Sequence, residues 1–448
     1  MLFYEYMERT LIGDLGTHIG ETVAISGFVD VRRDQGKLVF FDFRDRSGTV
    51  QGVVLPGDEV LMASAKEVRN EYVVTITGIV NARPEKNVQV DKVNGNIELE
   101  IKGIEVLSMA QELPFDKDAE VNLDTRFDYR PYTLRSERDR DIFTVQATIV
   151  DSYRKALARA GCTEFQAPAL VGGDAEGGSA VFKVGYYYDQ TAYLATSPQL
   201  YKQILVGVFE RVFTIAKIFR AEKSATTRHL SELTQMDFEI GFIADEFDVM
   251  RTLETVVRET VRDVTEKHAD VFARMQVPVP ELGTAFPILT LKEVHETLGV
   301  PAEDDMTPEH ERAICEWALK EHQCDFVFIT KFPTASRAFY TMSDSDNPTI
   351  SKGFDLLFRG LEINSGAQRI HNYDEMVARI EERGMDPKKF AFYLQAFKYG
   401  MPPHGGCSTG LERFTARMLN LGNVKEASTF PRDMNRIDTL LSDNQETV

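Results

Sequence analysis

Hydrophobic and polar residues alternate on both sides of a strongly charged stretch near the middle of the chain. The alternation predicts one strand over residues 212–220 and a second over residues 235–242. Between them, residues 219–233 carry two arginines, a histidine, a lysine and two glutamates. A loop this polar, mounted on two half-buried strands, favours ligand binding, although a solvated hairpin tip also fits these residues.

The N-terminal region shows a different pattern, with short alternating stretches separated by turn residues. Strands are predicted over residues 22–31, 38–44, 49–54, 72–81 and 97–106, with a helix over residues 58–68. Five strands with a helix in that place are typical of a small Greek-key barrel of the oligonucleotide-binding type. Arg33 in a basic turn, Phe40 and Gln51 then suit single-stranded nucleic acid, although Phe40 in the core fits equally well.

The rest of the chain combines helices, strands and glycine-rich loops. Residues 109–140 are loop-like and densely charged, which favours a linker or hinge. Helices are predicted over residues 142–160, 246–267 and 308–322, and strands over residues 162–168, 326–330 and 338–342. The two later helices carry no candidate site, and the histidines of this part of the chain lack metal-ligand spacing.

Two stretches before the charged hairpin are candidates for ligand contact. Residues 172–179 form a glycine-rich loop that includes Glu176 and lacks the GKS/T ending of the common phosphate loop. Ser197, which precedes a proline, predicts the N-cap of a helix. Gln199 and Lys202 would then lie on one face of that helix. An ordinary capped helix with polar surface residues fits this stretch as well.

A predicted hairpin in the C-terminal third brings two carboxylates together. If residues 359–360 form its turn, Asp355 is a diagonal neighbour of Glu362, roughly 7–8 Å away between backbones. Two converging carboxylates suit magnesium that bridges phosphate oxygens, and solvated strand residues are the alternative. Ser365 and Arg369 place a hydroxyl and a cation just beyond this hairpin.

A glycine-rich stretch over residues 402–410 leads into a helix that is expected to start near Gly410. Glycines let a strand approach a ligand closely. Leu411 begins the buried face of this helix, and Glu412 and Arg413 follow it in the first turn. Such a junction by itself is weak evidence for any function.

Composition narrows the class of protein. A chain of 448 residues with 43% hydrophobic and 27% charged residues is typical of a soluble globular protein of two or three domains. No membrane span or signal pattern is visible, so a cytoplasmic location is expected. The net charge of −19 argues against non-specific coating of nucleic acid, but not against a local basic surface. The four cysteines are scattered, which disfavours structural zinc and disulfides.

Taken in order, these segments resemble the three signature motifs of class II aminoacyl-tRNA synthetases. The long helix ending at Gly161 with its following strand, the charged hairpin with Arg220-x-Glu222, and the glycine-rich strand leading to Arg413 occur in the family's order. Further stretches resemble aspartyl-tRNA synthetases, namely residues 176–178, 199–203, 228–230, 362–366 and 402–406, with residues 33–51 matching the barrel of that family. The resemblance covers essentially the whole chain. It is closest to the compact archaeal and eukaryotic type, because the large bacterial insertion has no room between the second and third motifs.

The resemblance implies an α+β fold. Residues 1–108 would form a five-stranded OB-fold barrel that binds the anticodon, residues 109–140 a linker or hinge, and residues 141–448 a class II catalytic domain with a mostly antiparallel sheet flanked by helices. It also implies ATP-dependent attachment of L-aspartate to tRNA(Asp) through an aspartyl-adenylate, with release of pyrophosphate and AMP. Charging of tRNA(Asn) is left open. Mg²⁺ would accompany ATP, and a homodimer would form through residues 161–168.

The resemblance assigns a role to each candidate site residue. Arg220, Glu222 and Arg413 would be catalytic, and Glu176, Gln199, Lys202, Arg220, Ser365 and Arg369 would bind aspartate. ATP would contact Arg220, Ala221, Glu222, Arg228, His229, Leu230, Glu362, Gly410, Leu411, Glu412 and Arg413. Glu362, Ser365 and Asp355 would hold Mg²⁺, and Arg33, Phe40 and Gln51 would bind the anticodon.

The chain departs from the family pattern at three positions. Ser408 replaces the middle glycine of the third motif, Phe28 stands where the barrel often has tryptophan, and Leu233 stands where many relatives stack phenylalanine on adenine. His229 or Arg413 would then be the adenine partner.

Three alternative functions are weighed against this one. Asparaginyl-tRNA synthetase is disfavoured because an amide substrate would leave Lys202 and Arg369 unpaired. A non-catalytic RNA-binding paralogue is disfavoured by the intact Arg220, Glu222, Glu362 and Arg413. A tRNA-independent amide-forming relative would lack the barrel.

Overall fold

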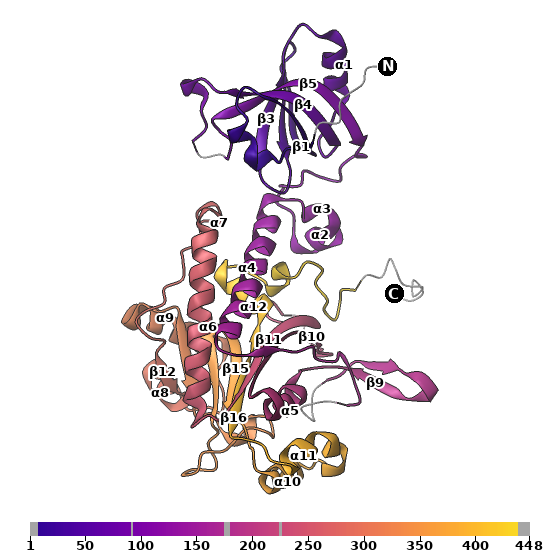
Figure 1. Ribbon diagram of the computed structural model, residues 1–448. Helices are drawn as coiled ribbons and strands as arrows, with labels where there is room; N and C mark the ends of the chain where they lie inside the picture. The colour runs from indigo at the N-terminus through magenta and orange to yellow at the C-terminus, as the bar shows by residue number, and fades with distance from the viewer. Residues whose placement is uncertain (1–7, 91–92, 174–179, 224–225, 438–448) are drawn as a thin grey trace. The chain divides into compact units, whose positions relative to one another are not determined.

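The computed structural model describes residues 8–90, 93–173, 180–223 and 226–437 (Figure 1). The chain divides into two compact units, residues 1–116 and residues 117–448. Each unit has a hydrophobic core of its own. None of the helices within the described ranges is long and apolar enough to cross a membrane.

The first unit is built around a closed barrel of five strands. Its strands and helix are β1 (Thr22–Asp34), β2 (Val39–Arg44), β3 (Thr49–Val54), α1 (Glu59–Glu67), β4 (Val73–Ala82) and β5 (Ile97–Ser108), with 3-10 turns at Ile12–Thr17 and Glu85–Asn87. The barrel order is β1-β2-β3-β5-β4. The predicted OB-fold barrel is therefore confirmed, and each predicted strand lies within three residues of an observed one.

Alternation along β2 decides where Phe40 points. Val39, Phe41 and Phe43 are buried in the barrel core, and the rings of Phe41 and Phe43 stack with their centroids 5.4 Å apart. Phe40 is only partly buried and pairs across the strands with Arg33. Because neighbouring strand residues point to opposite faces, Phe40 lies on the outer face of the barrel. The alternative of a core Phe40 is wrong.

The second unit is organised around a large mixed sheet. The sheet has eight strands in the order β12-β13-β14-β15-β16-β11-β10-β6, and only its β12–β13 and β10–β6 pairs are parallel. The strands are β6 (Thr163–Glu164), β10 (Arg211–Phe219), β11 (Glu232–Gly241), β12 (Ile288–Thr290), β13 (Phe326–Thr330), β14 (Gly353–Phe358), β15 (Leu361–Gln368) and β16 (His404–Gly410). A separate small sheet joins β7 (Leu170–Val171), β9 (Thr191–Leu194) and β8 (Lys183–Gly185).

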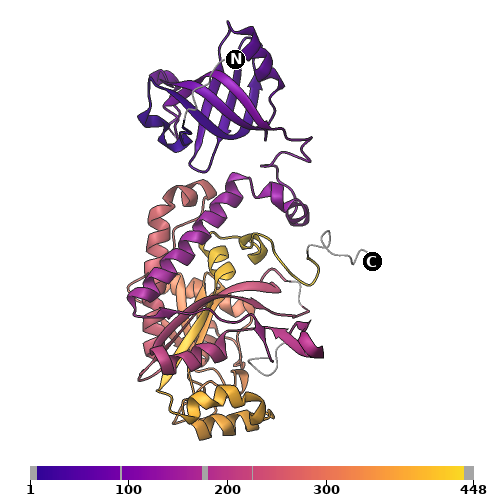
Figure 2. The same cartoon turned by 45° about the vertical axis from the view of Figure 1, so that its right-hand side comes forward.

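Helices cover both faces of this sheet. Their bounds are α2 (Leu123–Asp128), α3 (Arg130–Thr133), α4 (Glu137–Arg159), α5 (Gln199–Phe209), α6 (Glu246–Lys267), α7 (Ala269–Met275), α8 (Leu291–Leu298), α9 (Pro308–His322), α10 (Tyr373–Glu382), α11 (Ala391–Lys398) and α12 (Leu411–Met418). Helices α4 and α6 pack side by side and share the main core with β11, whereas α5 packs with α11 in a second core (Figures 1 and 2). This arrangement matches the predicted class II catalytic architecture.

The second half of the charged stretch at 109–140 is helical, so its prediction as loop was wrong there. Helices α2 and α3 occupy part of it, and α4 begins at Glu137, five residues before the expected start at residue 142. The charges that suggested a solvated loop are used internally. Asp139 pairs with Arg126 at 2.8 Å and with Arg130 at 3.4 Å, and the Ser136 hydroxyl accepts a hydrogen bond from the Asp139 amide, which caps α4.

Three other sequence predictions need correction. Residues 338–342 form no continuous strand, because Thr341 makes only an isolated bridge with Arg369 while the neighbouring aromatic side chains are buried. The strand predicted over residues 162–168 is reduced to β6, since only Thr163 and Glu164 pair with β10. Helix α5 has Pro198 rather than Ser197 at its N-cap, although the Ser197 hydroxyl still accepts a hydrogen bond from the Gln199 amide at 3.2 Å.

Candidate active site

Four neighbouring strands place one row of polar side chains on the same face of the large sheet. Asp355 on β14 pairs with Ser365 on β15, which pairs with Ser408 on β16, which pairs with Asp237 on β11. Residues directly opposite each other on antiparallel strands point to the same face, so these four side chains form a polar row. The alternate residues of β11, such as Phe238, point into the main core.

A cavity of about 330 Å³ lies over this row. Its walls include most of the predicted site residues, namely Gln199, Lys202, Arg220, Glu222, Arg228, His229, Leu230, Glu362, Ser365, Arg369, Gly410, Glu412 and Arg413. Ala221, Asp355 and Leu411 are not among the wall residues, and Leu411 packs in the main core. Glu176 lies outside the described residues. The fold thus brings together predicted site residues from four separate sequence regions.

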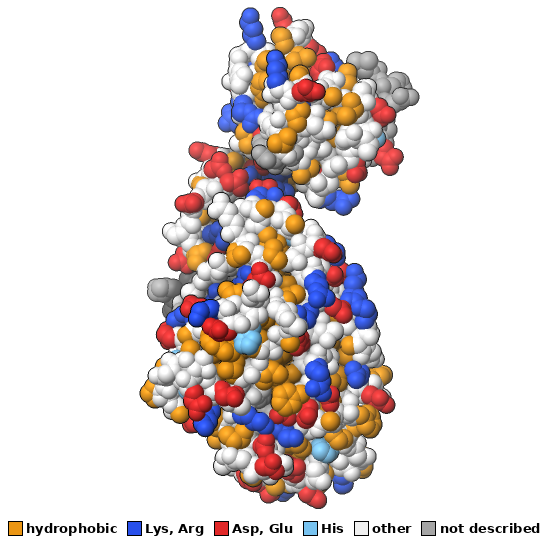
Figure 3. All heavy atoms as spheres, turned by 90° about the vertical axis from the view of Figure 1, so that its left-hand side faces the viewer, with side chains coloured by type: hydrophobic (Ala, Val, Ile, Leu, Met, Phe, Trp, Pro, Cys, Tyr) orange, Lys and Arg blue, Asp and Glu red, His pale blue; other side chains and the backbone are white. Residues whose placement is uncertain are grey.

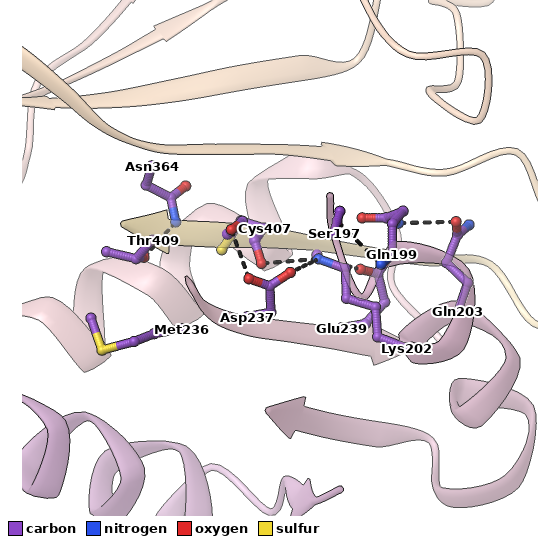
Figure 4. A network of polar contacts seen from close by, with 12 residues as sticks. Ser197, Gln199, Lys202, Gln203, Met236, Asp237, Glu239, Asn364, Cys407 and Thr409 are labelled. Atoms are coloured by element: carbon purple, nitrogen blue, oxygen red, sulfur yellow. Dashed lines mark hydrogen bonds and ion pairs between the residues drawn. The ribbon is translucent and has the colours of Figure 1, made fainter. Parts of the chain in front are cut away.

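One end of the cavity contains two buried ion pairs. The Lys202 ammonium lies 3.0 Å from the Asp237 carboxylate, and it donates to the Cys407 carbonyl at 3.1 Å (Figure 4). The Arg369 guanidinium donates to Glu239 at 2.9 Å. Burial by itself raises the pKa of Glu239, but Arg369 and Lys202 outweigh burial and hold that pKa below its ordinary value. Glu239 is therefore a charged partner.

These pairs overturn one argument made from the sequence. Lys202 and Arg369 were expected to be left unpaired by an amide substrate, yet Asp237 and Glu239 already neutralise them. Sequence reasoning gave those two carboxylates no role. The signal for them was present, because the alternation of β11 turns Asp237 and Glu239 away from the core that Phe238 joins.

Both cations keep hydrogen-bonding capacity despite their ion pairs. Arg369 uses Nε for Glu239 and Nη2 for the Gly406 carbonyl and Gln199, and no described residue accepts a hydrogen bond from its Nη1. Lys202 has three N–H groups: it donates to two partners within the described chain, and its ammonium has only a longer contact, of 3.4 Å, with a third, Glu239. This end of the cavity therefore offers donors to a ligand.

The predicted hairpin is confirmed, and its carboxylates share one face. Its turn residues, Arg359 and Gly360, have φ angles of 47° and 78°, as a tight two-residue hairpin requires. Asp355 is held by both terminal nitrogens of Arg337, at 3.0 and 2.7 Å. Glu362 lies 3.5 Å from Arg413. Burial raises the pKa of Glu362, Arg413 lowers it, and the neighbouring Asp355 raises it again.

The other end of the cavity is rich in arginine. Within the described part of the chain, Arg220 forms one ion-pair contact, a long one of 4.0 Å with Glu222, and 37% of its side chain is exposed. Arg228, in contrast, is held by both carboxylate oxygens of Glu311, at 3.1 and 3.0 Å. Glu311 also accepts a hydrogen bond from the Glu362 amide at 3.2 Å. Helix α9, which carries Glu311, therefore supports this end, contrary to the expectation that it carries no site residue.

Two of the three departures from the family pattern, Ser408 and Leu233, lie around the cavity. Ser408 donates from its hydroxyl to Asp237 at 2.7 Å, so a side chain at this position is accommodated and bonded. Gly406 is different, because a Cβ there would lie 2.2 Å from both the Phe238 carbonyl and the Glu239 carboxylate. Leu233 and His229 both line the cavity. Burial and the Arg413 charge lower the pKa of His229, which favours its neutral form.

His404 lies behind the cavity and is fully buried. Burial, assisted by Arg369 and His371 and opposed by Glu239 and the Pro402 carbonyl, lowers the pKa of His404 from 6.5 to about 4. The folded protein therefore resists protonation of His404, whereas the unfolded chain does not.

The pKa of His404 is lower in the folded state than in the unfolded chain, so below pH 6.5 the unfolded chain gains a proton that the folded protein does not. The contribution of neutral His404 to the free energy of unfolding is therefore complete above pH 6.5 and is lost as the pH falls to 4. The difference amounts to about 3 kcal/mol. We expect the free energy of unfolding of the wild type to fall by this much relative to His404→Asn between these pH values. Urea unfolding of both proteins at intervals across the window measures it, and parallel pH profiles would contradict the assignment.

The predicted anticodon residues gather on the outer face of the barrel. Arg33 pairs with Asp42 through two hydrogen bonds of 2.8 and 2.9 Å and reaches Gln51 at 3.4 Å. Phe40 lies opposite Arg33 on the adjacent strand. A cation, an amide and an aromatic ring on one sheet face can hold and stack unpaired bases.

Charge on the molecular surface is mixed where it can be seen. On the face drawn in Figure 3, basic and acidic side chains are interspersed, with hydrophobic side chains between them.

All four cysteines are buried and free, as expected for thiols without disulfide partners. Among the described residues, no group of three or more histidine, cysteine, aspartate or glutamate side chains is arranged to hold a metal ion.

Comparisons with known proteins agree with this architecture. The family model described as tRNA synthetases class II (D, K and N) matches residues 122–434, and that of the OB-fold nucleic acid binding domain matches residues 23–107. An aspartate–tRNA(Asp/Asn) ligase of Thermus thermophilus is 42% identical over 96% of this chain and 99% of that relative. An aspartate–tRNA(Asp) ligase of Pyrococcus abyssi is 36% identical over 93% of this chain and 96% of its own length.

A solved structure is similar over the whole fold. Asparaginyl-tRNA synthetase from Pyrococcus horikoshii, complexed with asparaginyl-adenylate, superposes with a TM-score of 0.88 and 31% identity, covering 96% of this chain and 99% of that one. Enzymes of this class attach an amino acid to tRNA in an ATP-dependent reaction. The chain belongs to the aspartate–tRNA ligase family, within the class II tRNA synthetases of the D, K and N group.

Proposed function

We propose that this enzyme activates L-aspartate with ATP and transfers it to tRNA(Asp), with tRNA(Asn) as a second acceptor to be tested. The observation that carries the choice of aspartate is the set of donors at the end of the cavity formed by Lys202 and Arg369. Both oxygens of a carboxylate accept hydrogen bonds, whereas the NH₂ of asparagine would face another donor. The argument rests on hydrogen bonding, because the charges are already paired.

The remaining cavity residues suit adenylate formation. The α-carboxylate of the amino acid attacks the α-phosphate of ATP, and no covalent enzyme intermediate is needed, so the protein contributes orientation and charge neutralisation. Arg220, whose charge is weakly paired, would hold the α-phosphate and the reacting carboxylate. Arg228 and Arg413 would neutralise the outer phosphates, and Gln199 would accept a hydrogen bond from the α-ammonium. The terminal ribose of tRNA then attacks the mixed anhydride.

Magnesium would be held with ATP at the hairpin that carries Glu362 and Ser365. Burial next to Asp355 raises the pKa of Glu362, so a cation there would relieve an unfavourable carboxylate environment. Mg²⁺ typically uses one or two carboxylates together with substrate phosphates, which fits a site with few protein ligands. It would supply charge neutralisation on the phosphates. Arg337 already binds Asp355, so we assign Asp355 a supporting position.

We also propose a separate role for each part of the chain. Residues 1–108 would bind the anticodon through Arg33, Phe40 and Gln51, residues 109–140 would link the two domains, and residues 141–448 would carry out catalysis. A homodimer would form through residues 161–168. Support for this comes from β6, which is the last strand of the large sheet and consists of exposed residues, so its outer edge suits a second chain.

The decisive experiment measures ATP–pyrophosphate exchange with each amino acid. We expect aspartate to support exchange and asparagine to support little, because only the carboxylate satisfies the donors of Lys202 and Arg369. Exchange with asparagine but not aspartate would establish the other specificity and overturn the proposal. Charging of tRNA(Asp) and tRNA(Asn) transcripts with labelled aspartate then decides which acceptors the enzyme uses.

A further inference from the structure

Three buried polar side chains lie behind the amino-acid end of the cavity without lining it. Gln203, Tyr393 and His404 are at most 2% exposed, and none of them belongs to the cavity wall. They come from α5, α11 and β16, which are distant in sequence. A continuous series of hydrogen bonds nevertheless connects them to Gln199, which does line the cavity. Figure 4 shows the bond of this series that joins Gln199 to Gln203.

The direction of each hydrogen bond is set at the His404 end. His404 Nδ1 lies 2.9 Å from the Pro402 carbonyl, which can only accept, so Nδ1 carries the proton. The pKa of His404, lowered to about 4 by burial, keeps the ring neutral and leaves Nε2 as an acceptor. The atom of Gln203 that lies 2.9 Å from Nε2 must therefore be its NH₂ group.

The orientation of Gln203 then determines that of Gln199. With its NH₂ used by His404, Gln203 turns its carbonyl oxygen to the opposite side, where it accepts from the Tyr393 hydroxyl at 3.0 Å and from Gln199 Nε2 at 2.9 Å. The carbonyl oxygen of Gln199 consequently faces Arg369 Nη2 at 3.5 Å. A flipped Gln199 amide would place acceptor against acceptor at Gln203 and donor against donor at Arg369.

We propose that Gln203, oriented by His404 and Tyr393, is a positioning residue that keeps the carbonyl oxygen of Gln199 directed into the amino-acid end of the cavity. An acceptor in that place suits the α-ammonium of the substrate, whereas an NH₂ group would repel it. The inference rests on the proposed function, because it takes Gln199 as the partner of that ammonium. Gln203 thereby sets affinity for the amino acid without touching it.

A double-mutant cycle in the full-length enzyme tests this role by ATP–pyrophosphate exchange. Gln203→Met has a similar shape and no acceptor, so we expect the KM for aspartate to rise about 10- to 100-fold, as for one hydrogen bond to a charged group. The KM for ATP should stay within about twofold. In a Gln199→Ala background, Gln203→Met should change the aspartate KM less than about twofold, because its effect passes through Gln199.

Two further variants separate positioning from general damage. Gln203→Glu keeps an acceptor toward Gln199, and a proton held between its second oxygen and His404 Nε2 replaces the lost NH₂ contact, so we expect the aspartate KM to stay within about threefold of wild type. Gln146→Met, which removes hydrogen bonds to Thr415 and the Ala427 carbonyl elsewhere in this unit, controls for the loss of a partly buried glutamine and should leave that KM unchanged.

Several outcomes would overturn the positioning role. These are an unchanged aspartate KM in Gln203→Met, an equal rise in both backgrounds, or a tenfold or larger rise in Gln203→Glu. The measurement on Gln203→Glu tests the positioning role even if Gln203→Met does not fold. Failure of the wild type to use aspartate at all would instead refute the proposed function.

Discussion

Arg220→Ala is expected to reduce aspartate-dependent ATP–pyrophosphate exchange by about 10³-fold or more, since it removes the cation that would neutralise charge developing on the α-phosphate. Arg220 is suited to this role because it lines the cavity and because, among the described residues, its one ion-pair contact is a long one of 4.0 Å with Glu222. Most of its charge is thus available to a ligand. The free energy of unfolding should change by less than about 0.5 kcal/mol, since the side chain is substantially exposed.

Lys217 provides a matched control three residues before Arg220. It is a cation of β10, the strand that ends just before Arg220, but it pairs with Glu232 at 3.7 Å and its side chain is 53% exposed and does not belong to the cavity wall. Lys217→Ala should therefore leave exchange unchanged, which would show that loss of any positive charge in this part of the chain is not sufficient. Near-normal exchange in Arg220→Ala, measured alongside an unchanged unfolding curve, would remove Arg220 from its assigned role.

Local patterns predicted the elements that depend on neighbouring residues. Alternation located the barrel strands, and the hairpin at Arg359 and Gly360 followed from its turn residues. Helical spacing placed α6 and α9 at the bounds that the structure has. In each case the information lies within about twenty residues of chain, which is the range over which periodicity acts.

Partners that lie far apart in the sequence could not be predicted in this way. Glu311 holds Arg228 across 83 residues, and it lies on an amphipathic helix that gives no local sign of a ligand-binding role. Arg337 holds Asp355 from a loop between strands. Charge density was also misleading near residue 130, because Asp139 draws two arginines into a buried cluster instead of leaving them in solvent. The partners of these residues are determined by the tertiary fold, which the local sequence does not show.

The chemical character of the amino-acid end depends on the same long-range pairing. From the sequence, Lys202 and Arg369 look like two free cations that select a negative side chain. In the fold, β11 places Asp237 and Glu239 between them, so the cluster has equal numbers of positive and negative groups. Selectivity for aspartate then relies on the direction of donors and acceptors, which is why the buried orientation of Gln199 and Gln203 matters.

Lys202→Met should destabilise the protein by about 3–5 kcal/mol, because it leaves two buried carboxylates opposite a single remaining cation. Lys202 is 1% exposed, and Asp237 and Glu239 are completely buried, so water cannot replace the lost ammonium. Methionine has nearly the same length and volume, which limits any contribution from a cavity. Thermal unfolding should show a clear fall in Tm, and aspartate-dependent exchange should be lost.

A second substitution shows whether unbalanced charge causes the loss of stability in Lys202→Met. Adding Asp237→Asn to Lys202→Met restores the balance of charges and keeps an oxygen that can accept from Ser408, so we expect much of the lost stability to return while exchange remains absent. Lys217→Met is the matched control, since it breaks an exposed ion pair that is worth less than about 1 kcal/mol. If the double variant is no more stable than Lys202→Met, packing around the lysine stem, rather than the stranded carboxylates, accounts for the loss.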